Sequence, residues 1–212
     1  MFNFDSVARN FNAHLTGQLP WYDGFMDGFF PEVASMFVRP CSLVYDFGAS
    51  TGNVEKRMLD IIKERDVLFT PIDNNVEMAN NYQLTTKVTI AELAEIEIKP
   101  YSFSTSILTL SFLHPSKRGQ FIQMLKDKCE VGGAFLILEK FVNKGGLTGT
   151  LFNQVTWRNK LEAKEPLEQI IKKELGLSGV QFPLSDDEVE GMQLVWAYGD
   201  FKAYLYVKGA KP

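Results

Sequence analysis

An apolar stretch that runs directly into a turn of small residues is the feature that most constrains this fold. Leu43–Phe47 has the length and composition of a buried strand, and Gly48–Gly52 consists of glycine, alanine, serine and threonine. A helical pattern follows from about Asn53 to Glu64. Small residues let the backbone approach a bound molecule closely, and the free N–H groups at a helix start attract electronegative atoms. We therefore predict a strand–turn–helix unit that binds a ligand, although a tight turn that binds nothing would show the same pattern.

Acidic residues stand at the ends of the first two predicted strands. Asp46 is in the first strand, where it could accept a hydrogen bond from an amino group of a ligand or stabilise the turn. Asp73 and Asn74 follow a second strand predicted at Val67–Ile72. A carboxylate at this place binds ribose hydroxyls in nucleotide-binding folds. The alternative for Asp73 is the N-cap of a helix predicted over Val76–Tyr82, and the two roles are compatible.

Strand and helix patterns continue to alternate along the middle of the chain. Further strands are predicted at Lys87–Ala91, Ser104–Leu110 and Phe135–Leu138, with a helix at Pro115–Lys128 between the last two. The continuous apolar run at 135–138 is typical of a strand buried on both faces. Such alternation predicts a mostly parallel sheet with helices on both faces.

The two ends of the chain depart from this alternation. Residues 1–40 are predicted as a helical lid, and residues 148–178 as a helical insert that is broken or kinked at Pro166. Leu194–Tyr198 and Lys202–Val207, joined by a Gly-Asp turn, predict a C-terminal β-hairpin. A length of 212 residues suits a single domain with these two additions.

Composition weighs against several classes of protein. The formal net charge of −4 provides no overall basic field for nucleic acid. The two cysteines and two histidines show no metal-ligand spacing, so we expect no metal site. No apolar run is long enough to cross a bilayer, and the first residues lack the pattern of a signal peptide. We therefore expect a cytoplasmic protein with reduced thiols.

The sequence resembles class I S-adenosylmethionine-dependent methyltransferases, with Asp46–Gly52 as the first motif and Asp73-Asn74 as the second. Within that class it is most similar to the carboxy-S-adenosylmethionine synthases, which make a cofactor used in tRNA wobble-uridine modification. The resemblance implies a Rossmann-like fold and S-adenosyl-L-methionine as cofactor. The other matching segments are Phe4-Asp5, Val7-Ala8, Phe11, Pro20 with Tyr22, Met78, Leu110-Ser111-Phe112-Leu113, Pro115, Arg118 and Glu139-Lys140-Phe141.

The resemblance also implies roles for single residues. Tyr22 would fold over the cofactor, and the Gly48 turn would cradle its methionine part. Asp73 and Asn74 would hold its ribose and adenine, and Glu92-Leu93, where the family usually has Asp and Ile, would flank the adenine. The predicted cofactor-binding residues are Tyr22, Asp46, Gly48, Ala49, Ser50, Gly52, Asp73, Asn74, Glu92 and Leu93.

The chain departs from the synthase pattern at two places. The family has an Asn in the fourth strand, where Ile107 stands here. It also has an Arg in the helical insert that pairs with the extra carboxylate of the carboxylated cofactor, and Lys164-Glu165-Pro166 occupies that register. Lys does not reproduce a bidentate Arg–carboxylate pair, and Arg158 lies nearby without a definite place. We therefore predict a methyltransferase that prefers the unmodified cofactor.

Methyl transfer requires alignment of an acceptor more than acid–base chemistry, so candidate catalytic residues are few. His114, after the fourth strand, is the best-placed base, although it could equally be a helix cap before Pro115. His14 in the N-terminal segment could equally be a packing residue or a functional one. Trp157 and Arg158 would shape a substrate pocket or join the core.

Three functions stay open. They are a methyltransferase of unknown acceptor, a cofactor-modifying synthase, and a non-catalytic S-adenosylmethionine-binding protein. The partners we expect are the small-molecule cofactor, an unidentified acceptor and a second copy in a homodimer. We expect no contact with a membrane.

Overall fold

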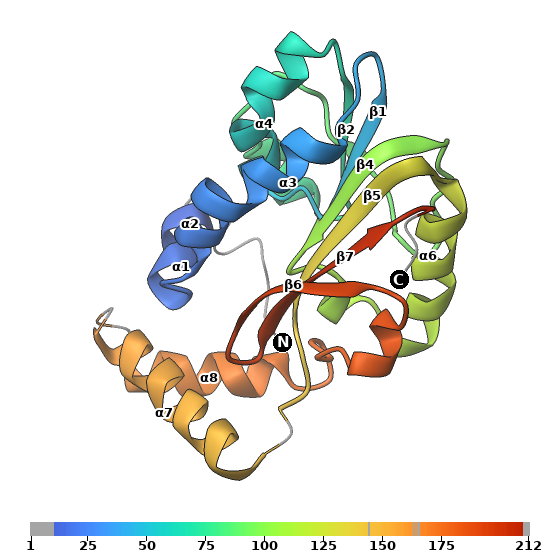
Figure 1. Cartoon of the computed structure of the whole chain (residues 1–212). Helices are drawn as coiled ribbons and strands as arrows, with labels where there is room; N and C mark the ends of the chain where they lie inside the picture. Colours follow the sequence, from blue (N-terminus) through green and yellow to red (C-terminus); the bar gives the residue numbers. More distant parts are fainter. Residues whose placement is uncertain (1–10, 144, 163, 165, 210–212) are drawn as a thin grey trace.

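The computed structural model describes residues 11–143, 145–162, 164 and 166–209, without the side chain of His14. Within this part, seven strands form one sheet in the order β3-β2-β1-β4-β5-β7-β6 (Figure 1). The matches to the synthases at residues 4–8 lie outside it. The strands are β1 (Leu43–Phe47), β2 (Leu68–Asp73), β3 (Thr89–Ile90), β4 (Tyr101–Ile107), β5 (Cys129–Lys140), β6 (Gln193–Tyr198) and β7 (Phe201–Val207).

The direction of the strands confirms the predicted architecture. β1 to β5 are parallel, whereas β7 pairs antiparallel with β5 on one side and with β6 on the other. The last two strands are the predicted hairpin, with its turn at Gly199-Asp200. The strand order reverses next to β1, and parallel α/β sheets bind ligands outside the carboxyl ends of their strands at such a point.

Helices pack on both faces of the sheet, and each does so through one apolar side. α3 (Phe30–Phe37) and α4 (Asn53–Glu64) cover one face, and α6 (Pro115–Lys128) covers the other (Figure 1). Phe30, Val33 and Ala34 of α3 are buried at helical spacing, which is why that side faces the sheet. α2 (Tyr22–Gly24) and the π-helical turn η3 (Phe25–Phe29) lead into α3.

The helical insert forms two helices near the carboxyl ends of the strands. α7 (Gly146–Glu162) and α8 (Leu167–Leu177) lie below the sheet in Figure 1, and α1 (Phe11–Gln18) contacts α7. Pro166 immediately precedes α8, which confirms the predicted break because proline favours a helix start over a helix interior. Within the described part, no helix combines the length and apolarity needed to cross a membrane.

The fourth strand is placed differently from the prediction. β4 ends at Ile107 rather than Leu110, because Leu108 takes a positive φ of 55° and η4 (Leu110–Phe112) turns away as a 3-10 helix. The carboxylate of Glu139, on β5, accepts hydrogen bonds from the backbone N–H groups of Thr109 and Leu110, both at 2.5 Å. The prediction of a strand over Ser104–Leu110 is therefore wrong, since this long-range contact overrides the apolar pattern.

Candidate functional site

A cavity of about 160 Å³ lies where β1, β2 and β4 end. Except for Gly52, every residue predicted to bind the cofactor lines it, although their contacts with a cofactor stay predictions. The predicted residues in its wall are Tyr22, Asp46, Gly48, Ala49, Ser50, Asp73, Asn74, Glu92 and Leu93.

The turn after β1 has a backbone that only glycine can follow at its first position. Gly48 has a φ of +79°, and a Cβ there would lie 2.0 Å from Oγ1 of Thr109. The N–H groups of Gly48 and Ala49 both donate to the carbonyl of Ile72, at 2.8 and 2.9 Å, so the turn is fixed to β2. Gly52 begins α4 with a φ of +95° and faces the ring of Tyr82 rather than the cavity. Gly48 therefore shapes the wall, whereas Gly52 shapes the helix start.

Asp73 connects the end of β2 to this turn. Its Oδ2 accepts a hydrogen bond from the Ser50 N–H at 2.7 Å, and its Oδ1 accepts one from the Asn75 N–H at 2.8 Å. The N-cap of α5 (Val76–Asn80) is Asn75, whose side chain accepts from Met78 N, so the reading of Asp73 as N-cap is wrong. Burial raises the pKa of Asp73, and its backbone hydrogen bonds oppose that rise. Each carboxylate oxygen keeps a lone pair that can accept a hydrogen bond from a hydroxyl group of a ligand.

Asp46 is the most unusual polar group in the cavity wall. Its side chain is 1% exposed, and Oδ1 accepts a hydrogen bond from Oγ1 of Thr105 at 2.8 Å. The other oxygen, Oδ2, is buried and has no hydrogen-bond partner among the described residues. Burial raises the pKa of Asp46 to about 7. A buried carboxylate with a free oxygen is costly to ionise unless a cation lies beside it, so this wall is suited to a positively charged group.

Two predicted residues meet at one side of the cavity. The side-chain amide of Asn74 donates to both carboxylate oxygens of Glu92, at 3.1 and 3.2 Å, and Leu93 lies next in the chain. An amide, a carboxylate and an apolar side chain together can bind a planar polar ring through its edge and its face.

N-terminal helices close the cavity on another side. Tyr22 of α2 is 3% exposed, and burial raises its pKa. Phe11 and Leu15 of α1 line the cavity beside it, and so does Asn53 at the start of α4. The sequence reasoning missed Leu15 and Asn53 as wall residues. Asn53 could have been found, because it directly follows the small-residue turn.

A larger cavity of about 360 Å³ adjoins the first. Phe11, Leu15, Leu108 and Phe112 line both, so they form the boundary between them. Most of the remaining wall comes from α7, α8, the turn of the C-terminal hairpin and residues 18–21, which follow and end α1.

Lysines provide the positive charge of the larger cavity. Lys160 pairs with Glu174 at 2.5 Å, and Lys173 donates to Oε1 of Gln18. Lys140, at the end of β5, lines the same cavity. Arg158 instead lines a shallow groove on the outer side of α7, so the insert brings no arginine into this cavity. Trp157 lines both the larger cavity and this outer groove. Its exposed fraction of 47% excludes it from the core.

His114 lies at the start of α6. Its Nδ1 accepts a hydrogen bond from Ser116 N at 3.3 Å and lies 2.8 Å from Ser116 Oγ. The side chain is exposed and belongs to neither cavity wall. This geometry is that of an N-cap, and the catalytic role of His114 stays a prediction.

Solved structures of methyltransferases share this fold. A S-adenosylmethionine-dependent methyltransferase from Clostridium acetobutylicum superposes with a TM-score of 0.59, at 11% identity, over 94% of this chain and 99% of that one. Human N-acetylserotonin methyltransferase, solved with S-adenosylmethionine, gives a TM-score of 0.58 at 15% identity, over 97% of this chain and 57% of that one. The sheet order, the antiparallel β7 and the cavity beside β1 define the class I methyltransferase fold.

Sequence relatives narrow this class to one family. The carboxy-S-adenosyl-L-methionine synthase of Staphylococcus epidermidis is 30% identical over 190 residues, covering 87% of this chain and 82% of the relative. The synthase of Methylococcus capsulatus is 25% identical, and the match covers 84% of this chain and 78% of that relative. The chain belongs to the carboxy-S-adenosyl-L-methionine synthase family. No protein-family model matches the sequence.

Proposed function

We propose that the chain is an enzyme that binds S-adenosyl-L-methionine in the smaller cavity and transfers its methyl group to an acceptor in the larger one. The observation that carries this proposal is Asp46, which lines this cavity and whose buried Oδ2 lacks a hydrogen-bond partner among the described residues. S-adenosylmethionine carries an ammonium and a sulfonium cation, and either favours an ionised carboxylate nearby.

The remaining wall residues suit the other parts of this ligand. The Gly48–Ser50 turn would hold its methionine part, and Asp73 would accept its ribose hydroxyls. Asn74, Glu92 and Leu93 would flank its adenine. Tyr22 with the rest of segment 1–40 would act as a lid, and residues 148–178 as the insert that builds the acceptor cavity within the same domain.

For transfer of the methyl group, the acceptor atom must lie in line with the bond between sulfur and the methyl carbon, on the side of that carbon opposite the sulfur. Water must also be excluded. The sulfonium supplies an already activated methyl group. Leu108 and Phe112, which line both cavities, are placed to border that path and to exclude water. For an acceptor that must lose a proton, His114 is the candidate base, and its ring would have to leave Ser116 to reach the cavity.

Calorimetry and a transfer assay together test this proposal. We expect S-adenosylmethionine and its demethylated product to bind more tightly than NAD, and Asp46→Asn to weaken both by removing the negative charge. Labelled methyl groups should then move from the cofactor into an acceptor of a cell extract. NAD affinity equal to or above that of S-adenosylmethionine would refute the cofactor assignment.

A second candidate is synthesis of the carboxylated cofactor, which membership of the family favours. Lys140 is the observation on its side, because it lines the larger cavity from the end of β5 and its positive charge acts on Glu174 there. A lysine supplies a point charge rather than a bidentate pair, so we still expect the unmodified cofactor to be preferred.

Mass spectrometry of cofactor that copurifies from cells making both forms separates the two candidates. A predominance of the carboxylated form that disappears in Lys140→Ala would favour the synthase over the methyltransferase and would identify Lys140 as the partner of the extra carboxylate. We further propose that the protein acts in the cytoplasm and as a homodimer.

A further inference from the structure

An asparagine of α1 bonds to the place where the turn after β1 (Gly48–Gly52) becomes α4. Oδ1 of Asn12 accepts a hydrogen bond from Oγ1 of Thr51 at 3.0 Å and a second from Nδ2 of Asn53 at 2.7 Å. Thr51 belongs to the turn, and Asn53 is the first residue of α4 and lines the smaller cavity. Asn12 itself belongs to neither cavity wall. It can therefore affect a ligand only through the residues that it holds.

The two donors that Asn12 holds are almost completely buried. Thr51 is 2% exposed and Asn53 is 8% exposed, whereas Asn12 is half-buried. Among the described residues, Asn12 is the hydrogen-bond acceptor for both donors. A buried donor that loses its acceptor costs free energy, because it has already given up its bond to water. Both donors therefore favour the state in which α1 stays at this place.

The turn needs such contacts because its backbone is strained. Ser50 has a φ of 50°, which costs free energy for a residue with a side chain. Asp73 holds the turn from β2 through the Ser50 N–H, and Asn12 holds it from α1 through the Thr51 hydroxyl group. A strained turn persists when its surroundings fix it from more than one direction.

The same helix also contributes to the walls of both cavities. Phe11 and Leu15, which are four positions apart and so lie on one side of α1, line the smaller and the larger cavity. At the other end of α1, Oε1 of Gln18 accepts a hydrogen bond from Lys173 of α8, and both residues line the larger cavity. The position of α1 therefore sets the shape of the cofactor cavity and of the acceptor cavity together.

We propose that Asn12 is a positioning residue for the cofactor, which it binds indirectly by holding α1 against the turn after β1. The proposal rests on the proposed function of the smaller cavity. Without the two hydrogen bonds of Asn12, a smaller fraction of the molecules would have the turn and α1 arranged for binding. The apparent affinity for S-adenosylmethionine falls with that fraction, although Asn12 lines neither cavity.

Calorimetry with S-adenosylmethionine tests this coupling. Asn12→Ala should weaken binding roughly fivefold or more, which is the lower end of couplings between separate sites. Asn12→Asp should restore most of the affinity, because Thr51 and Asn53 are both donors and a carboxylate accepts from both. Thr16→Ala is the matched control on α1, since its hydroxyl group bonds to Ala13 within the helix. Unchanged affinity in Asn12→Ala, or an equal loss in Asn12→Asp, would overturn the proposal.

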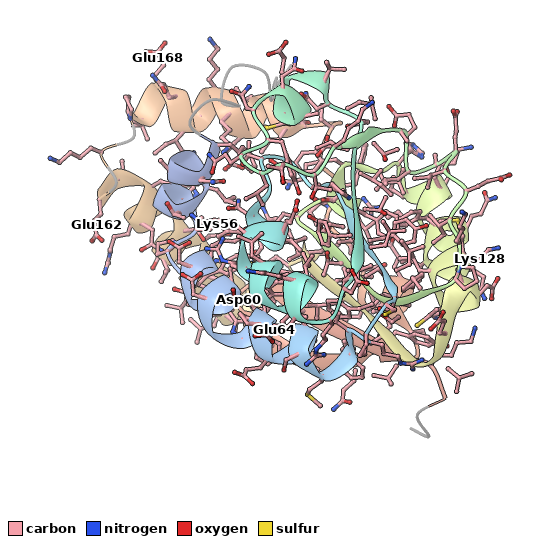
Figure 2. The ribbon with its side chains drawn as sticks, turned by 90° about the horizontal axis from the view of Figure 1, so that it is seen from above. Lys56, Asp60, Glu64, Lys128, Glu162 and Glu168 are labelled. Carbon is pink, nitrogen blue, oxygen red and sulfur yellow. The ribbon has the colours of Figure 1, made fainter. Side chains whose placement is uncertain are left out.

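A double-mutant cycle shows whether Asn12 acts through the turn. Thr51→Val keeps the shape of the side chain and removes one donor, so it should weaken binding less than Asn12→Ala does. The double variant should bind no more weakly than Asn12→Ala alone, because the bond is already lost. Asp60→Ala is the control on α4, where Figure 2 shows Asp60 between Lys56 and Glu64, and all three are exposed. It should leave the affinity unchanged. Losses that add in the double variant would contradict the coupling.

Proteolysis without cofactor separates this proposal from the cofactor assignment. Cleavage near Pro20 should be faster in Asn12→Ala than in the unmodified chain or in Thr16→Ala, and saturating S-adenosylmethionine should reduce the difference. Circular dichroism would show that all three proteins fold. An unmodified chain that does not bind S-adenosylmethionine would refute the proposed cofactor, and the cleavage rates would still test Asn12. Equal rates in the three proteins would refute its role in holding α1.

Discussion

Asp73 accepts a hydrogen bond of 2.7 Å from the backbone N–H of Ser50. The bond joins the end of β2 to the turn after β1, so one carboxylate both lines the cavity and holds the turn that forms part of its wall. The second oxygen of Asp73 is bonded to Asn75 N, at the start of α5. Removal of this side chain therefore affects binding and local structure together.

Asp73→Ala should weaken S-adenosylmethionine binding by about 1.5–3 kcal/mol, the range for losing a hydrogen bond to a charged group. It should also lower the melting temperature, because Ser50 N and Asn75 N lose their acceptor. Asp73→Asn is the control that keeps one acceptor oxygen. It should lose less binding affinity and less thermal stability than Asp73→Ala. Calorimetry and thermal unfolding measure the two effects, and unchanged affinity together with an unchanged melting temperature would contradict the assignment.

Binding of S-adenosylmethionine should strengthen as the pH rises from about 5.5 to 7. Burial raises the pKa of Asp46 to about 7, and a cationic ligand favours the ionised carboxylate, so binding at lower pH must first remove a proton. The amino group of the ligand stays largely protonated over this range and does not obscure the effect. Titrations of the unmodified chain and of Asp46→Asn across the range would measure it. A pH dependence that survives in Asp46→Asn would assign it to another group.

The stability of the unliganded protein should change with pH in the opposite sense. Burial raises the pKa of Glu139 from 4.5 to about 7, so the folded state binds this proton more tightly than the unfolded state does. The corresponding stability is fully present below about pH 4.5 and is lost as the pH rises through about 7. Urea unfolding at several pH values should show a smaller loss over this range in Glu139→Gln than in the unmodified chain. An equal loss would show that Glu139 titrates normally.

Limited proteolysis near Pro20 should slow when S-adenosylmethionine is added. Tyr22 and Phe11 line the cavity from the N-terminal helices, so a ligand in the cavity adds contacts to this segment. The rate of cleavage with saturating cofactor, compared with the rate without it, measures this effect. Cleavage between α7 and α8 serves as an internal reference. Equal rates near Pro20 in both samples would refute the lid.

Two substitutions of His114 separate a helix cap from a base. His114→Ala should lower stability by roughly 1 kcal/mol, whereas His114→Asn should keep most of it, because asparagine is a good N-cap. Methyl transfer measured in both variants then decides the chemistry. A loss of roughly 10²-fold or more in both, with cofactor affinity unchanged, supports the base, since general-base catalysis contributes about that much. Full activity in His114→Asn would show that His114 is a helix cap and not a catalytic base.

Local patterns in the sequence were sufficient for the unit that builds the cofactor cavity. The predicted bounds of the strand Leu43–Phe47 and of the helices Asn53–Glu64 and Pro115–Lys128 agree with β1, α4 and α6. Each is specified by neighbouring residues, through apolar periodicity, small residues in a turn, or proline in a first helical turn. Parallel strands then bring Asp46 and Asp73 to the same edge of the sheet, which is why the candidate wall residues could be named from the sequence.

Contacts between distant residues decided the rest. β4 ends early because Glu139, thirty positions further along the chain, binds the N–H groups that would have continued the strand. Arg158 faces outward and Lys140 lines the larger cavity because of how the insert packs against the hairpin turn, and no periodicity specifies that packing. A local pattern records which side of an element is apolar, whereas the partner of that side depends on how the whole chain packs.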